Sequence, residues 1–137
     1  MRKAIQLLFA ITITATLSGC LCCNLSQNLN TIENAAQTQN TKECDSMDET
    51  MRSICYSTIA VSSGNTSICD KIQGEDLNIG CYISVAVQND DPSICGKIRL
   101  EDAKESCILQ IAARTRDKEV CNSLTQESKR QECAKEL

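Results

Sequence analysis

DPSICGKIRLEDAKESCILQIAARTR, residues 91–116, is the unit from which most of this chain is built. Residues 40–64 and 65–90 repeat its pattern, and a shortened copy runs over 117–137. The second cysteine of each copy recurs every 26 residues, at Cys55, Cys81, Cys107 and Cys133. The first cysteines are Cys44, Cys69, Cys95 and Cys121, so the first copy is one residue shorter between its two cysteines. A repeat of this length predicts one supersecondary unit per copy.

Each copy is predicted to begin with a short helix. Four residues before each first cysteine stands a residue type that caps helix N-termini, namely Asn40, Asn65, Asp91 and Asp117. In the third copy Pro92 follows the cap, where the missing N–H costs no helical hydrogen bond. Ile94, Cys95 and Ile98 then form one apolar face. This spacing predicts a helix of about two turns.

A second helix is expected after a turn in every copy. Six residues before each second cysteine is a glutamate, at Glu49, Glu75, Glu101 and Glu127. A negative charge there favours the exposed N–H groups and the dipole of a helix start. Apolar residues follow at helical spacing, such as Ala103, Cys107 and Ile111 in the third copy, and no alternation with period two indicates strands.

The N-terminal segment has the features of a secretory signal. Arg2 and Lys3 precede an apolar run, Ala4 to Leu17, that is too short for a comfortable membrane span. The closing tetrapeptide Leu17-Ser18-Gly19-Cys20 resembles the lipobox of prokaryotic lipoproteins. The resemblance implies cleavage after Gly19, a signal peptide over 1–19, and thioether lipidation of Cys20. The alternatives are an uncleaved anchor extending through Cys23 and an ordinary cleaved signal.

Residues 20–39 are expected to hold the lipidated cysteine and a flexible tether. The stretch 21–39 is rich in Asn, Gln and Thr and almost uncharged, so it lacks the apolar surface needed to order itself. A helical turn is conceivable over Thr31 to Ala36. Cys22 and Cys23 are intermolecular staples, further acylation points or idle thiols, and the sequence leaves these three readings open.

The charge of the chain argues against nucleic acid as a partner. The whole sequence has 14 basic and 18 acidic side chains and no histidine. Loss of residues 1–19 removes two basic and no acidic side chains, which leaves 12 against 18 and a net charge of −6. An acidic domain without a Lys/Arg run is poorly suited to neutralising phosphates.

Disulfides are the expected use of the repeat cysteines in an exported chain. Pairing within each copy uses all eight, as Cys44–Cys55, Cys69–Cys81, Cys95–Cys107 and Cys121–Cys133. Pairing between copies would give Cys55–Cys69, Cys81–Cys95 and Cys107–Cys121, and would leave Cys44 and Cys133 unpaired. We prefer the first scheme because an antiparallel hairpin brings Cys95 level with Cys107, although sequence alone does not fix connectivity.

Metal, redox and hydrolytic chemistry find little support. Zinc sites use closely spaced cysteines and often histidine, and redox sites use a Cys-x-x-Cys arrangement at a helix start; the eight repeat cysteines show neither spacing. Without histidine, Ser–His and Cys–His nucleophile pairs are impossible. The recurring glutamates are explained by the helix dipole. We therefore expect no cofactor, no metal and no catalytic residue.

The repeats predict an all-α array of four disulfide-stapled helical hairpins of about 26 residues, a short α-solenoid or curled bundle over residues 40–137. The fourth copy is expected to act as a polar cap, since Lys129 stands where Leu77 and Ala103 occur. In architecture the array resembles the disulfide-bridged Sel1-like repeats, whose repeats are longer and differently spaced. Its cysteine columns are more similar to helical repeats of uncharacterised prokaryotic lipoproteins, a class with no agreed activity.

These observations predict a membrane-anchored, extracytoplasmic lipoprotein that acts as a non-enzymatic binding or scaffold module for an envelope or extracellular protein. A structural or antigenic surface lipoprotein without a discrete partner is the alternative, and an enzyme is a remote one. Specificity is expected where the copies differ, in the turns between helices and at the basic residues near repeat ends. The candidate binding residues are Arg99, Leu100, Arg114 and Arg116.

Overall fold

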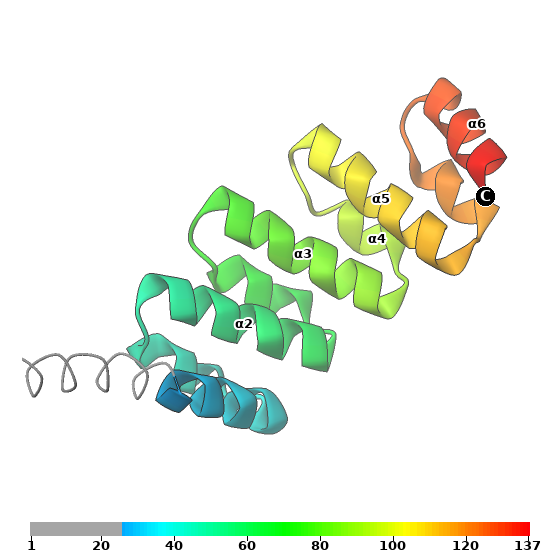
Figure 1. The fold of residues 1–137 in the computed structure, drawn as a ribbon. Helices are drawn as coiled ribbons and strands as arrows, with labels where there is room; N and C mark the ends of the chain where they lie inside the picture. The colour runs from blue at the N-terminus through cyan, green and yellow to red at the C-terminus, as the bar shows by residue number, and fades with distance from the viewer. Residues whose placement is uncertain (1–25) are drawn as a thin grey trace, which may run out of the picture.

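The computed structural model describes residues 26–137, which fold into four helical hairpins stacked in a row (Figure 1). Residues 26–38 form a helix ahead of the first hairpin. The later elements are η1 (Thr41–Ser46), α2 (Glu49–Ser63), η2 (Thr66–Lys71), α3 (Glu75–Asn89), α4 (Pro92–Cys95), α5 (Glu101–Thr115), η3 (Lys118–Ser123) and α6 (Glu127–Glu136). The predicted all-α fold with stapled repeats is confirmed, and the described residues contain no strand.

The short first helix of each hairpin begins at its predicted cap. The four cap side chains accept backbone N–H groups two residues further along the chain, at 2.9–3.3 Å. Three of these helices are 3₁₀ rather than α, and the third, which has Pro92 at its start, is a single α-turn. In every copy the residue three positions after the cysteine donates its N–H to the cysteine carbonyl. This 3₁₀ pattern suits a short connector that must reverse direction within a few residues.

Each long helix begins at its predicted glutamate. Glu49, Glu75, Glu101 and Glu127 are the first residues of α2, α3, α5 and α6. Of these helices, only α2 also has a side-chain cap: the carboxylate of Asp48 accepts a hydrogen bond from the backbone N–H of Met51. The other three helices rely on the favourable interaction of acidic side chains with the exposed N–H groups of the first turn.

Four disulfides join the short helix of each hairpin to its long helix. The bonds are Cys44–Cys55, Cys69–Cys81, Cys95–Cys107 and Cys121–Cys133, with Cα atoms 5.6–5.8 Å apart. Pairing within each copy is therefore confirmed, and pairing between copies is excluded. Every half-cystine is almost completely buried, so the bonds lie inside the array rather than on its surface.

Each long helix except the last ends at a residue with left-handed backbone geometry. These residues are Gly64, Asp90 and Arg116, with φ of 67°, 53° and 55°. Each directly precedes the cap of the next short helix. After α3, the backbone N–H of Asp91 returns to the carbonyl of Ala86 at 3.0 Å, which satisfies one of the unpaired carbonyls at the helix end.

The helix over 26–38 ends in the same way. Gln39 has φ of 55°, and the N–H of the following Asn40 bonds to the carbonyl of Ala35 at 3.0 Å. Ala35 lies five residues before its cap, as do Ala60, Ala86 and Ala112 in later copies, and all four are buried. Asn30 stands where the long helices have their cysteine. The segment is thus the second half of a further repeat that lacks a staple, and we call it the N-terminal half-repeat.

The half-repeat corrects the expected extent of the tether. Residues 26–38 are helical, and Ile32 and Ala35 belong to the same apolar cluster as the cores of the four hairpins. The ordered array therefore starts at least fourteen residues before Asn40, at residue 26. The low apolar content of the segment misled the sequence prediction because two well-placed residues are enough to dock a helix onto an existing core.

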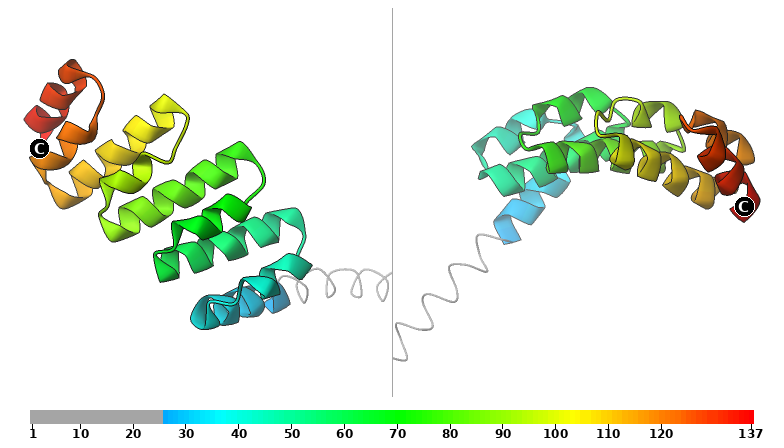
Figure 2. Two further views of the ribbon diagram at one scale, coloured as in Figure 1. Left: turned by 180° about the vertical axis from the view of Figure 1, so that it is seen from behind. Right: turned by 90° about the horizontal axis from the view of Figure 1, so that it is seen from above.

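The long helices α2, α3 and α5 lie side by side, with the short helices on the other side of the row (Figure 1). Seen from above, the row curves, and the half-repeat packs at its N-terminal end (Figure 2). The buried aliphatic side chains and half-cystines form one continuous cluster along the row. Within residues 26–137, no helix has both the length and the apolar character needed to cross a bilayer.

Candidate functional site

A hollow lies at the turn side of the array, between the second and third repeats. It has a volume of about 530 Å³, within the range typical of small-ligand pockets. We call it the turn groove. It is lined by Asp70, Ile72, Gly74, Glu75, Asn78, Ile79 and Tyr82 of the second repeat and by Lys97, Ile98 and Arg99 of the third.

The two walls of the turn groove have opposite charge. Asp70 and Glu75 come from η2 and the start of α3, whereas Lys97 and Arg99 come from the connection between α4 and α5. All four side chains are exposed, and none takes part in the ion pairs formed within residues 26–137. The arrangement gives a negative wall facing a positive wall, with apolar side chains between them.

Gly74 gives the turn of the second repeat a backbone shape that the other turns lack. Its φ is 95°, whereas Asp48, Leu100 and Gln126 at the same position have φ of −60°, −77° and −91°. An L side chain is strained in that conformation. The turn beside the groove therefore differs in its backbone, as well as in its side chains, from the equivalent turns.

Tyr82 and Asp70 fix one wall of the turn groove. The buried Tyr82 hydroxyl donates a hydrogen bond to Oδ1 of Asp70, across the Cys69–Cys81 staple. Burial, the hydrogen bond to Asp70 and the charge of Asp70 raise the pKa of Tyr82 to about 12, against a smaller opposite effect of Arg99. Tyr82 is therefore a neutral donor that holds Asp70 in place.

The first repeat has the same tyrosine–aspartate pair. Tyr56 donates to Asp45 across the Cys44–Cys55 staple, and burial together with Asp45 raises its pKa. In both repeats the aspartate directly follows the first cysteine and the tyrosine directly follows the second. The same two positions hold Gly96 and Ile108 in the third repeat and Asn122 and Ala134 in the fourth, so the pair is absent there. The sequence analysis missed this joint replacement, which becomes visible once the cysteines are paired within each copy.

A smaller hollow of about 150 Å³ occupies the equivalent place between the first and second repeats. Its lining includes Tyr56, Glu49, Arg52 and Lys71. Here one of the two cations is already engaged, because Lys71 lies 5.6 Å from the centre of the Tyr56 ring and donates to the hydroxyl of Thr41. The smaller hollow therefore offers less space and fewer available charges than the turn groove.

We expect the two tyrosines to titrate above the ordinary range in the folded protein. Because folding raises their pKa values, the stability that they contribute is complete below about pH 10, where unfolded tyrosine titrates, and is lost as the pH rises toward about 12 for Tyr82. The chain has two tyrosines and no tryptophan, so tyrosinate absorbance reports on these groups alone. In the variant Tyr56→Phe, the titration midpoint of Tyr82 should lie well above the midpoint of the same variant in denaturant. Adding Asp70→Asn to this variant should lower the midpoint of Tyr82 in the folded protein. Equal midpoints in the folded and denatured protein would refute the assignment.

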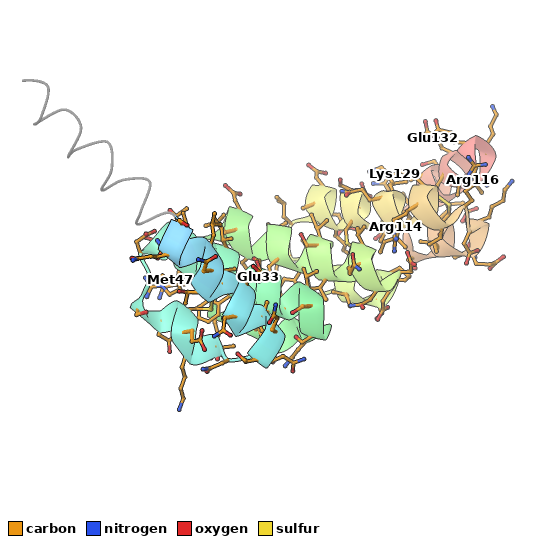
Figure 3. All side chains as sticks on the ribbon, turned by 60° about the horizontal axis from the view of Figure 1, so that its bottom comes forward. Glu33, Met47, Arg114, Arg116, Lys129 and Glu132 are labelled. Carbon is orange, nitrogen blue, oxygen red and sulfur yellow. A yellow bond between two sulfur atoms is a disulfide. The ribbon has the colours of Figure 1, made fainter. Side chains whose placement is uncertain are left out.

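The structure divides the four predicted binding residues into two places. Arg99 lines the turn groove, and Leu100 is 53% exposed beside it. Arg114 and Arg116 lie at the opposite end of α5, about 20 Å away for a helix of this length. In Figure 3 these two arginines lie toward the C-terminal end of the array, with Lys129 and Glu132, whereas Glu33 and Met47 lie at its N-terminal end.

Arg114 and Arg116 take part in joining the repeats. The Arg114 guanidinium bonds to the carbonyl of Val87 and to the carboxylate of Asp90, both at the end of α3. Arg116 is the residue with left-handed geometry at the end of α5. We therefore restrict the candidate site to the turn groove. The sequence showed the positive charge of these residues but not the carbonyl and carboxylate that face Arg114.

The turn groove offers charged and apolar side chains for contact. Its perturbed titratable group is a phenol whose pKa is raised, which is the wrong direction for a base near neutral pH. Among residues 26–137, no group of three or more His, Cys, Asp or Glu side chains is placed to hold a metal ion. What the groove can do is bind a molecule with both charges and an aliphatic part.

The predicted lipobox and the cysteines Cys20, Cys22 and Cys23 lie outside the described residues. The four disulfides of the array are typical of proteins in an oxidising, extracytoplasmic compartment. Comparisons of the chain with protein-family models, with curated proteins and with solved structures find no match.

Proposed function

We propose that this chain is a membrane-anchored, extracytoplasmic and non-enzymatic binding module that recognises an envelope or extracellular protein. The observation that supports the proposal best is the turn groove, in which two carboxylates face two cations that have no ion-pair partner within the described array. The staples Cys69–Cys81 and Cys95–Cys107 stiffen the two hairpins that line the groove, and stiff walls lower the entropy cost of binding.

The anchor, if placed on Cys20, limits where the partner can be. Five residues, 21–25, separate Cys20 from the first described helical residue. Even a fully extended chain would cover only about 20 Å over that distance. The array would then remain near the bilayer, so a partner at the same membrane surface fits the proposal better than a distant one.

The test of this function is capture by the intact lipidated protein in membranes, with cross-linking. The variant Lys97→Glu/Arg99→Glu reverses one wall of the turn groove, and Lys42→Glu/Lys118→Glu makes the same change of net charge at exposed sites elsewhere. Both should keep stability within about 0.5 kcal/mol. We expect the groove variant to lose a partner that the wild type and the control variant both retain. Identical sets of captured proteins for all three would contradict binding through the groove and favour a structural surface protein.

The lipid anchor has its own test. We expect the intact mass of the detergent-extracted protein to correspond to a chain without residues 1–19 and with added lipid on Cys20. Cys20→Ser should leave the chain without added lipid. A wild-type chain that still begins at Met1 and has no added mass would exclude lipidation.

A further inference from the structure

The turn groove differs from the equivalent interface between the third and fourth repeats, which is closed by its own side chains. There the Thr125 hydroxyl donates to Glu101 at 2.8 Å, and Lys129 pairs with the buried Glu105. Within the fourth repeat, Arg130 donates to the carbonyl of Leu124 at 2.9 Å. Two polar pairs, Thr125–Glu101 and Lys129–Glu105, therefore cross the boundary between these repeats, although Oε1 of Glu105 has no hydrogen-bond partner within the described structure.

The corresponding positions at the turn groove do not pair. Glu75 occupies the position of Glu101, and Arg99 occupies that of Thr125, yet the two form no hydrogen bond or ion pair within the described structure. Ile79 and Ala103 occupy the positions of Glu105 and Lys129. At the turn groove, the apolar residues Ile79 and Ala103 thus take the place of the Glu105–Lys129 pair, and the charged side chains that remain lie at the edges of the groove.

The apolar floor gives the groove a second property. Ile72 and Ile98 are buried, and Ile79 is partly buried, at the base of the groove. The Tyr82 hydroxyl beside them already donates to Asp70. An occupant would therefore meet aliphatic side chains in the middle, carboxylates on one side and cations on the other.

We propose that the turn groove binds an extended peptide segment in which a basic residue and an acidic residue are adjacent in sequence; this inference rests on the proposed binding function. Successive side chains of an extended peptide point to opposite sides. A Lys-Glu pair therefore directs its ammonium toward Asp70 and Glu75 and its carboxylate toward Lys97 and Arg99. The aliphatic stems of such residues cover the isoleucine floor. Polyanions such as nucleic acids and anionic lipid headgroups fit poorly, because they bring phosphates against the carboxylate wall.

The experiment uses the full mature protein in detergent micelles and four fluorescent nonapeptides with blocked ends. One has a central Lys-Glu pair in an Ala/Ser background, and the others have Gln-Glu, Lys-Gln or Gln-Gln at the same positions. We expect anisotropy to show binding of the Lys-Glu peptide, and each neutralised charge to weaken it roughly tenfold, as expected for the loss of one charge-assisted contact. Lys97→Glu/Arg99→Glu should abolish that binding, and Lys42→Glu/Lys118→Glu should preserve it.

The outcomes separate this inference from the proposed function. Lack of binding of the Lys-Glu peptide at millimolar concentration overturns the inference, as does equal binding of the Gln-Gln peptide or of the groove variant. If the groove variant still loses its membrane partner in the capture experiment, the binding function stands and only the peptide class is wrong. If neither experiment depends on the groove charges, both proposals fail.

Discussion

Reduction of the four disulfides is expected to unfold the whole array. Each bond closes a loop of 11 or 12 residues, and the chain-entropy model gives about 3 kcal/mol for such a loop. Four loops sum to roughly 12 kcal/mol, which is comparable with the whole net stability of a domain of this size. The described core has little large apolar surface to replace that contribution. Apart from Tyr56 and Tyr82, it consists of aliphatic side chains and half-cystines.

The measurement is the far-ultraviolet circular dichroism of the protein with and without reductant in mild denaturant, where the buried bonds become accessible. Loss of helical signal should coincide with the appearance of free thiols. As a graded control, replacing Cys69 and Cys81 together by alanine should cost about 2–5 kcal/mol. Retention of a cooperative thermal transition after complete reduction would show that side-chain packing, not the staples, maintains the fold.

Ala35→Asp is expected to destabilise the array by about 2–4 kcal/mol, although it lies in a segment whose composition predicts a tether. Ala35 is 0% exposed, at the column shared with Ala60, Ala86 and Ala112. A carboxylate there must either be buried or push the half-repeat off the first hairpin. For a domain of about a hundred residues, this corresponds to a fall in melting temperature of roughly 10–25 °C.

Gln37→Asp supplies the matched control, since Gln37 is exposed on the same helix and receives the same new side chain. It should change stability by less than about 0.5 kcal/mol. Thermal melts of both variants, with the disulfides intact, make the comparison. Equal melting temperatures for Ala35→Asp and wild type would restore the tether to its predicted end at residue 39.

Two features of the molecule follow from short-range chemistry and were predictable from the sequence. The helix starts at Asn65 and Glu75 depend on side chains that satisfy N–H groups or a dipole within one turn. Cys95 and Cys107 are 12 residues apart, on the two helices of one hairpin. The turn between these helices brings the two cysteines together, and their disulfide then holds the hairpin closed. Such interactions act between residues close in sequence, and the period of the repeat displays them several times.

The half-repeat and the turn groove were decided by contacts between repeats, and the tertiary structure alone reveals them. Ile32 and Ala35 are ordered because the first hairpin offers an apolar face, which the composition of residues 26–38 does not indicate. Arg114 and Arg99 are both arginines near a helix end, yet one meets the end of α3, 24 to 27 residues earlier, and the other lines a groove. Whether a charged side chain finds a hydrogen-bond or ion-pair partner depends on the residues that the stacking of repeats places opposite it. The sequence determines each hairpin by itself, and the stacking of hairpins determines the candidate site.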